Sequence, residues 1–325
     1  MSTKKKSPFG TLSDVEAATV EWLWEPLIPF GMVTIVEGDP GIGKSFLMMH
    51  LAALVSTGGK LPNGQRVRKG HVLVISAEDD AAYTVRPRID AMGGDPERIR
   101  YLAEYSAFDD KGLAALRTEV LEHEPSLIII DPLFAFVPSA SDMYKPNEIR
   151  ALLAQLAEVA SEAEAAMIVV RHLRKSSATK AIYQGIGSID VIGAARSALL
   201  VGIHPEDIDL RVVAHLKHNI APRGDSWLYE LDAKIEGQMP VLRWRGKSNL
   251  TVEDLLGAAP SNQSAMDAAM TFLREELKDG PKPAKEVFDK AGAAGHAERT
   301  IQRAKDAIGI KSKKHKDGWL WSLPD

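Results

Sequence analysis

The chain of 325 residues contains no cysteine, which excludes disulfide bonds and thiolate metal sites and leads us to expect a cytoplasmic protein. It lacks any apolar run of membrane-spanning length, and the three lysines at 4–6 are not followed by a sustained apolar stretch. We find no repeat of solenoid type. The net charge of −4 gives no general attraction for a polyanion, so any nucleic-acid surface must be local. The length predicts one large domain and one smaller one.

One stretch carries a phosphate-binding pattern. Gly38 and Gly43 stand five positions apart and are followed by Lys44 and Ser45, between an apolar run at 32–36 and an apolar segment at 46–55. This strand, loop and helix context is that of a P-loop. Glycines let backbone N–H groups surround a phosphate, the helix N-terminus favours the same anion, and Lys44 adds a mobile charge. Ser45 is the expected Mg²⁺ ligand. The predicted nucleotide-binding residues are Gly38, Asp39, Pro40, Gly41, Ile42, Gly43, Lys44, Ser45 and Phe46.

Alternation of buried strands with helices predicts a doubly wound α/β fold with a mostly parallel central sheet. The expected strands of this part lie at 32–36, 71–77, 99–102, 127–131, 166–172 and 197–201. Helices are expected after the P-loop and at 81–92, 110–123 and 148–165. Paired strands at 210–217 and 226–231 are expected to extend the sheet antiparallel at one edge, and a strand at 240–244 is expected to close the domain. A polar tail over 1–19 precedes this domain.

Carboxylates at the ends of two predicted strands are candidates for handling the metal and the attacking water. Asp131 follows the apolar run 127–130, at the place of the carboxylate that orients Mg²⁺ through a water. Capping the turn before Pro132 is the structural alternative. Because a proline follows Asp131, the residue that positions the water must lie elsewhere. Glu78 is the leading candidate, and Asp79 and Asp80 are its rivals.

Three further side chains are candidates for sensing the nucleotide or completing the site. His172 ends the strand at 166–172 and can report the γ-phosphate, although a lone histidine is more often structural. Arg196 and Lys217 are cations outside the P-loop, and either could neutralise the transition state in a neighbouring subunit, as an arginine finger does. Solvated or structural ion pairs are the alternative for both.

The C-terminal part predicts a different kind of module. Residues 246–262 are rich in small and polar residues and predict a linker. Helices at 266–277, 280–290 and 297–308 and a hairpin strand at 317–321 predict a winged helix-turn-helix over 263–325. Cations and amides in the third helix and the wing suit contacts with duplex DNA. Winged helices also bind proteins, which is the alternative. The predicted DNA-binding residues of this module are Arg299, Gln302, Arg303, Lys313 and Lys314.

These features together resemble the RecA-like ATPases, and most closely the hexameric plasmid RepA-type helicase branch often found on phages and mobile elements. The resemblance covers roughly residues 20–245. It rests on Gly38 to Ser45, Ser76-Ala-Glu78-Asp79, Ile130-Asp131-Pro132-Leu133, His172, Gly187-Ser188 through Arg196, and Lys217-His-Asn219-Ile-Ala-Pro222.

This resemblance implies a RecA-like ATPase domain over 20–245 that uses ATP and Mg²⁺. It implies that Glu78 is the catalytic carboxylate, that His172 is the sensor and that Arg196 acts in trans. Lys217 matches the lysine of a Lys-x-Asn element. Relatives in the DnaB branch follow that element with a second finger arginine, but Asn219 stands there in this chain, so Arg196 carries more weight.

The resemblance also implies where single-stranded DNA would bind, on loops that face the centre of a ring. The loops at 138–147 and 173–187 have the corresponding positions, and only the second is basic. A flexible, solvated loop is the alternative. Its candidate DNA-binding residues are Arg174, Lys175 and Lys180.

The sequence therefore predicts an ATP-hydrolysing, ring-forming homo-oligomer, a hexamer by resemblance, that acts as a replicative DNA helicase of a plasmid, phage or mobile element. ATP is favoured over GTP because no Asn-Lys-x-Asp motif occurs. One alternative is a DNA-bound ATPase switch that does not unwind DNA. A small-molecule P-loop kinase is disfavoured by the C-terminal module and by the absence of an arginine-rich lid.

Overall fold

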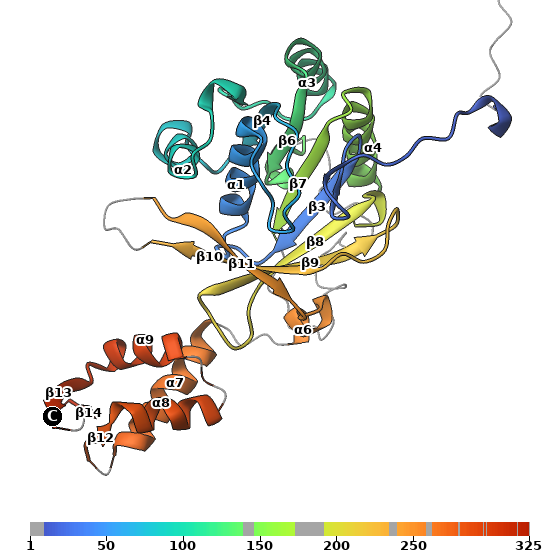
Figure 1. Cartoon of the computed structure of the whole chain (residues 1–325). Coiled ribbons are helices and arrows are strands. Elements are labelled where there is room, and N and C mark those ends of the chain that lie inside the picture. The colour runs from blue at the N-terminus through green and yellow to red at the C-terminus, as the bar shows by residue number, and fades with distance from the viewer. Residues whose placement is uncertain are drawn as a thin grey trace, which may run out of the picture.

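The computed structural model describes residues 10–138, 146–172, 192–233, 239–257, 262–278, 280–294, 296, 298–316 and 318–324. It has an α/β core built on a nine-stranded sheet and a smaller C-terminal group of helices and strands (Figure 1). The strands of the large sheet are β3 (Val33–Gly38), β4 (His71–Ser76), β5 (Ile99–Tyr101), β6 (Pro125–Asp131), β7 (Ala166–His172), β8 (Ser197–Ile203), β9 (Leu210–His218), β10 (Ser226–Asp232) and β11 (Val241–Ser248).

The large sheet is parallel on one side and antiparallel on the other. Its spatial order is β11-β10-β9-β8-β3-β7-β6-β4-β5. The strands from β8 to β5 in that order pair in parallel, whereas β9, β10 and β11 continue from β8 as antiparallel neighbours. The predicted antiparallel edge is therefore confirmed. The parallel strands are almost continuously buried, which explains their apolar, β-branched sequences.

Helices cover both faces of this sheet, as the doubly wound pattern predicts (Figure 1). Side chains of α1 and α2 join one apolar cluster, and side chains of α3 and α4 join the other. The helices of the core are α1 (Lys44–Thr57), α2 (Arg86–Ala91), α3 (Asp110–His123), α4 (Pro146–Glu162) and α6 (Val252–Gly257). Shorter elements are 3-10 turns at Leu12–Asp14, Pro96–Arg98 and Leu133–Phe136, a π-helical turn at Ala81–Val85, and the small strands β1 (Trp22–Trp24) and β2 (Ile28–Pro29).

Helix α1 is held in the core by an apolar surface that extends around most of its circumference. Leu47, Met48 and Leu51 are among its fully buried side chains, and each contributes about 1.5–3 kcal/mol of burial free energy. Gly43 before the helix and Gly58 after it both have left-handed backbone conformations, with φ of 94° and 76°. These conformations suit glycine and fix both ends of the helix.

The linker expected over 246–262 is in part structured. Strand β11 continues to Ser248, and α6 packs against β8 and β9. Val252 is buried with Leu200, and a methyl group placed on Gly202 would come within 3.2 Å of Leu255. The segment that was predicted as a linker from its small and polar residues therefore contains a short apolar contact surface. The core extends beyond residue 245.

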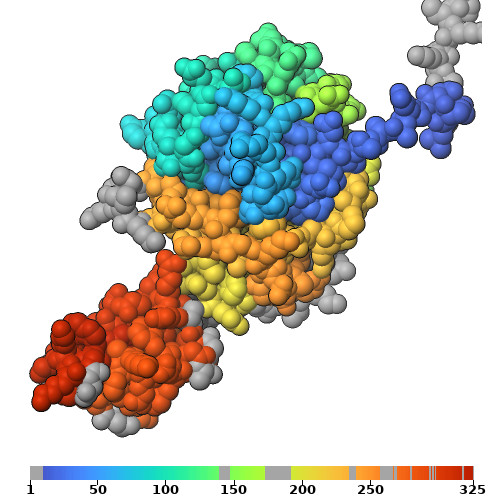
Figure 2. Space-filling model, in the orientation of Figure 1, coloured from blue at the N-terminus to red at the C-terminus, as the bar shows by residue number. Residues whose placement is uncertain are grey.

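The C-terminal part has three helices, a three-stranded antiparallel sheet and its own apolar core. The helices are α7 (Asn262–Leu277), α8 (Ala284–Ala293) and α9 (Glu298–Ile308), and the strands, in spatial order, are β12 (Lys282–Pro283), β14 (Gly318–Ser322) and β13 (Lys311–His315). Leu273, Val287, Ile301 and Trp321 are buried together. Figure 2 shows this part as a separate lobe, coloured orange to red, beside the yellow segment of the core. None of the helices within the described residues is long and apolar enough to cross a membrane.

Candidate nucleotide site

The predicted site residues lie at the carboxyl ends of neighbouring parallel strands. Strand β7 lies between β3 and β6, and β4 follows β6. Gly38 at the end of β3 is opposite His172, and Asp131 at the end of β6 is opposite Ser76. The connection from β3 to α1 is therefore next to His172 and within reach of Asp131. Ligands of open α/β sheets bind at this edge.

The first glycine of the P-loop is required by a close approach of two backbone segments. A methyl group on Gly38 would lie 2.3 Å from the carbonyl oxygen of Val201 in β8 and 2.5 Å from Ile42 Cδ1. Gly41 has a left-handed backbone conformation, with φ of 76°, and a methyl group placed on it would have no other atom within 4 Å. The loop therefore lies against β8 at its start and turns outward, leaving the N-terminus of α1 open to an anion.

Lys44 is folded back onto the loop that carries it. Its Nζ donates to the carbonyl oxygens of Gly38 and Asp39, at 2.9 and 2.8 Å, and lies 3.0 Å from Nδ1 of His172. These contacts use all three N–H donors of the ammonium group, so a phosphate must displace at least one. Burial lowers the pKa of Lys44 to about 8, and the nearby carboxylates of Asp131 and others oppose this shift.

Ser45 and Asp131 form the oxygen pair that the sequence predicted for Mg²⁺. Ser45 Oγ donates to Asp131 Oδ2 at 2.7 Å, although 86 positions separate the two residues. Burial raises the pKa of Asp131, and the hydrogen bond from Ser45 acts in the opposite direction. Hydroxyl and carboxylate oxygens are the donors that Mg²⁺ prefers, so the pair fits this ion. Within the described residues no group of three or more histidines and acids could hold a metal alone, and the remaining ligands of a Mg²⁺ ion here would be phosphate oxygens and water.

His172 connects Lys44 to the leading candidate for the catalytic carboxylate. Because Lys44 donates to Nδ1, the neutral ring carries its proton on Nε2, which lies 3.5 Å from Glu78 Oε2. Glu78 is largely exposed. Its rivals are engaged elsewhere: Asp79 pairs with Arg88 at 2.7 Å, and Asp80 accepts two backbone N–H groups at the start of the next helical turn. Of the three carboxylates, Glu78 is the one that faces His172.

Two polar groups beneath the P-loop were missed by the sequence interpretation. Glu37 and Arg171 are opposite each other on β3 and β7, both almost fully buried, with their charged groups 3.1 Å apart. Burial raises the pKa of Glu37 and lowers that of Arg171, and each residue opposes the shift of the other. They directly precede Gly38 and His172, so this pair supports both the P-loop and the end of β7. The sequence signal that could have revealed this pair is one charged residue inside each of two otherwise apolar strands.

Two aromatic side chains also support the loop. The Arg88 guanidinium group lies 4.4 Å above the ring of Phe46, and Arg88 is in turn held by Asp79. The hydroxyl of Tyr229, on β10, donates to the carbonyl oxygen of Gly43 at 3.4 Å. The antiparallel edge therefore contacts the P-loop through a buried tyrosine, which sequence spacing alone could not have indicated.

Arg196 and Lys217 lie at the opposite end of the strands from the P-loop. Arg196 precedes β8 and is five residues, or about 17 Å at the rise of a strand, from Val201, which contacts the loop. Lys217 is next to it across the sheet, with its Nζ donating to the carbonyl oxygens of Ile192 and Gly193, both at 2.8 Å. Burial, followed by the charges of Arg196 and Arg150, lowers the pKa of Lys217. Neither cation reaches the P-loop of its own chain.

The predicted DNA-binding residues fall into three groups. Arg174, Lys175 and Lys180 lie outside the described residues. Lys313 and Lys314 are exposed on β13. Arg299, Gln302 and Arg303 on α9 face the core: Arg303 pairs with Asp209 at 2.9 Å, and Arg299 and Gln302 line a cavity that also includes Asp207.

Comparison with known proteins gives a consistent result. The profile of the AAA domain family, AAA_25, matches residues 4–178. A DNA repair protein RadA from Mycobacterium tuberculosis is 29% identical over 151 residues, which are 46% of this chain and 28% of that protein. RadA proteins from Streptococcus pyogenes and Streptococcus pneumoniae are 29% and 25% identical over 147 residues, 45% of this chain and 28% and 31% of theirs. The chain thus matches less than a third of the length of these relatives.

Proposed function

The chain belongs to the AAA domain family, and on this premise we propose that it is a RecA-like ATPase that acts as a ring-forming DNA motor. The observation that carries the proposal is the set of contacts at the carboxyl edge of the sheet. Lys44, His172 and Glu78 follow one another within hydrogen-bonding or ion-pair distance, and Ser45 is bonded to Asp131. These groups match the tasks of phosphate binding, sensing, water positioning and metal binding.

In the proposed mechanism the terminal phosphates of ATP draw Lys44 away from His172. The N–H groups of the P-loop and of the first turn of α1 hold the phosphate oxygens. Ser45 and Asp131 would hold Mg²⁺, which would neutralise charge that develops on the phosphates. Glu78 orients a water for in-line attack. His172 then loses one partner when the phosphate is present and regains it afterwards, so its position reports the state of the nucleotide.

The second half of the site comes from a neighbouring chain in this proposal. Arg196 and Lys217 are too far from their own P-loop to act there, but a neighbour placed head-to-tail, with the amino ends of its parallel strands towards this P-loop, could present them to it. A positive charge so placed stabilises the transition state for phosphoryl transfer. Hydrolysis then requires an oligomer, for which we propose a hexameric ring.

Mixing two inactive variants tests the shared site. Arg196→Ala should abolish ATP hydrolysis and leave nucleotide binding close to that of the unmodified chain, because Arg196 is remote from its own P-loop. Glu78→Gln should also be inactive. An equal mixture of the two variants should regain about a quarter of full activity, since random neighbours combine an intact Glu78 with an intact Arg196 at one site in four. Steady-state phosphate release measures this recovery.

The control for this experiment is Arg117→Ala, which removes another arginine that is partly exposed and paired with Glu158 on the surface. This variant should keep its activity. Two results would refute the shared site. One is full ATPase activity of Arg196→Ala. The other is ATPase activity per chain of the unmodified protein that stays constant on dilution to the monomer.

We further propose that the C-terminal lobe is a winged helix-turn-helix domain over about 263–325 that binds duplex DNA. Its three helices, its antiparallel sheet and the exposed lysines of β13 support this. Similarity to RadA proteins, which are named for DNA repair, supports an association of the ATPase with DNA. Replication of a plasmid, phage or mobile element is the process in which we propose that the motor acts.

A DNA-bound switch that hydrolyses ATP without unwinding is the second candidate. It is favoured by the contact of α9 with the core, because a module held against the ATPase domain suits control of DNA binding by assembly. Strand displacement on a forked duplex separates the two candidates. A motor should release the displaced strand in an ATP-dependent reaction, whereas a switch should hydrolyse ATP and leave the fork intact.

A further inference from the structure

The cationic face of α9 is already occupied in this structure. Arg303 Nη1 donates to Asp209 Oδ1 at 2.9 Å. Arg299 Nη1 donates to Glu230 Oε2 at 3.1 Å, and its Nε lies 3.5 Å from Asp209 Oδ2. The two arginines come from the C-terminal lobe, whereas both carboxylates belong to the antiparallel part of the core sheet, Glu230 in β10 and Asp209 directly before β9. Two of the residues expected to bind DNA phosphates therefore bind carboxylates of the same chain.

The two carboxylates are held in place to receive these arginines. Glu230 lies in β10 with only 4% of its side chain exposed, and it also accepts a hydrogen bond from Arg245. The hydrogen bond from Arg245, followed by that from Arg299, lowers the pKa of Glu230. The carbonyl oxygen of Asp209 accepts from Arg211 at 2.6 Å, and its backbone N–H donates to Asp207. The acidic surface, Asp209 and Glu230, is thus fixed by the core itself.

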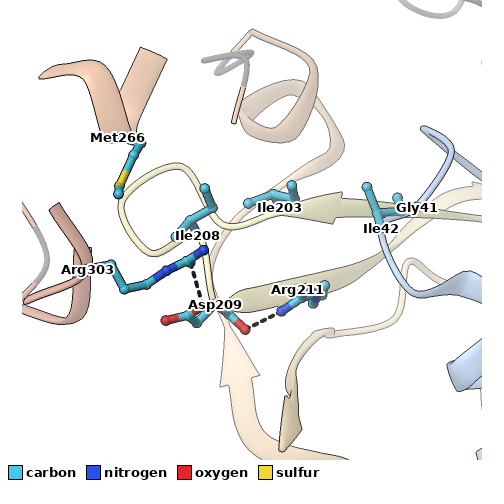
Figure 3. Close-up of a pocket in the computed structure, with 8 residues that line it drawn as sticks. All are labelled: Gly41, Ile42, Ile203, Ile208, Asp209, Arg211, Met266 and Arg303. Carbon is cyan, nitrogen blue, oxygen red and sulfur yellow. Dashed lines mark hydrogen bonds and ion pairs between the residues drawn. The ribbon is translucent and has the colours of Figure 1, made fainter. Parts of the chain in front are cut away.

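The contact between lobe and core combines ion pairs with apolar side chains and is incompletely packed. A cavity of about 270 Å³ remains between the two parts, lined by Gly41, Ile42, Ile203, Ile208, Asp209, Arg211, Met266 and Arg303. Figure 3 shows Arg303 contacting Asp209 at one end of this cavity. Met266 and Ile208 face each other from the lobe and from the core. Interfaces within one chain that are held by ion pairs and leave space unfilled permit relative motion.

We propose that the acidic surface of Asp209 and Glu230 is an internal docking site for the DNA-binding face of α9, so that the core and DNA compete for the same arginines. Carboxylates and phosphates are alternative partners for a guanidinium group, and one arginine cannot pair fully with both. The docked chain is then the form with low affinity for DNA, and DNA binds the lobe only after it leaves the core. This inference rests on the proposed DNA binding by the lobe.

Neutralising the acidic surface tests the competition in the full chain. The double variant Asp209→Asn, Glu230→Gln should bind a fluorescently labelled duplex of about 25 base pairs roughly tenfold more tightly, equivalent to about 1.4 kcal/mol. This size follows from a few partly exposed ion pairs. Fluorescence anisotropy at fixed salt measures the affinity. The control variant Asp232→Asn, Glu253→Gln changes the net charge equally, at acids paired with Arg243 and Arg223, and should bind like the unmodified chain.

Two further measurements keep the result interpretable. If Glu230→Gln impairs folding, Asp209→Asn alone should still strengthen binding several-fold, because Asp209 is more exposed and contacts both arginines. Because the chain has no cysteine of its own, Ile208→Cys and Met266→Cys can be joined across the cavity by a short bis-maleimide reagent. The crosslinked chain should bind the duplex at least about tenfold more weakly than the same variant before crosslinking.

The outcomes separate this inference from the proposed function. If Arg299→Ala, Arg303→Ala weakens binding but the acidic-surface variant binds like its control, DNA binding by the lobe stands and the docking competition is refuted. If none of the chains binds duplex DNA, both are refuted. An equal gain in the control variant would attribute the effect to net charge and would also refute the competition.

Discussion

Gly38 is the position at which a single methyl group gives the sharpest test of the candidate site. Gly38→Ala would place the new carbon 2.3 Å from the carbonyl oxygen of Val201 and 2.5 Å from Ile42 Cδ1. The end of the Ile42 side chain can turn away, but the Val201 carbonyl belongs to β8, which is paired with β3 on one side and β9 on the other. The P-loop must therefore move, because the strand cannot.

The size of the effect follows from this displacement. The loop has to shift by about 0.7 Å or more before the contact reaches even the shortest separations found in packed proteins. Such overpacking costs about 1–3 kcal/mol of folding free energy, or a fall in Tm of about 2–10 °C. Loss of one or two N–H bonds to phosphate, at about 1.5–3 kcal/mol each, should weaken ATP binding by about 10-fold to over 100-fold.

The assay is a titration with a fluorescent ATP analogue, with thermal unfolding measured in parallel. Gly64→Ala is the matched control, because Gly64 also has a positive φ, 85°, but has open space around it and lies away from the site. It should lower Tm through backbone strain and leave ATP affinity unchanged. Adding Ile42→Val to Gly38→Ala should not restore binding, since the Val201 contact remains. ATP affinity of Gly38→Ala within threefold of the unmodified chain would refute the assignment of the loop geometry.

The remaining predictions concern catalysis and acid stability. Glu78→Gln should lower ATP hydrolysis by about 10²-fold to 10⁴-fold and leave ATP binding intact, whereas Asp80→Ala, which removes a helix cap, should lower Tm more than turnover; the reverse pattern in phosphate-release assays would exchange their roles. His215 is buried, and burial lowers its pKa to about 4, so the unfolded chain takes up a proton between about pH 6.5 and 4 that the folded chain refuses. Stability should therefore fall as pH falls through that window. His215→Gln, which retains an acceptor for the Gly224 N–H, should reduce this fall by about 3 kcal/mol in denaturant titrations, and an unchanged pH dependence would contradict the buried neutral ring.

Much of the core could be predicted because its sequence signals are local. The apolar run before Asp131 is long and β-branched, and the predicted strand at 127–131 is observed as part of β6. The predicted helix at 110–123 coincides with α3, whose start is fixed by Asp109 accepting two backbone N–H groups. The spacing of Gly38, Gly43 and Lys44 placed the loop between a strand and a helix. Each of these signals lies within about a dozen residues.

The features that the sequence did not reveal depend on contacts between distant segments. Leu255 packs on Gly202, so part of the expected linker belongs to the core. Glu37 and Arg171 pair across β3 and β7, and only the strand order shows that they are neighbours. Arg299 lies on the exposed face that was expected, but its guanidinium group pairs with Glu230, 69 positions earlier. Contacts of this kind are decided by topology, which the local periodicity of the sequence does not encode.

The location of Arg196 has a consequence for how copies of the chain can associate. The P-loop and Arg196 lie at opposite ends of the same strands, so a twofold pair can match the P-loop of each chain with Arg196 of the other only if the two chains lie antiparallel, and such an assembly stops at two chains. In the proposed ring the association is instead head-to-tail, and it either closes or continues as a screw. In an open arrangement one P-loop at the end has no neighbour, so the number of competent sites is one fewer than the number of chains. Closure of the ring gives the last P-loop its neighbour. The ATPase activity per chain should therefore rise with each added chain and rise once more when the ring closes.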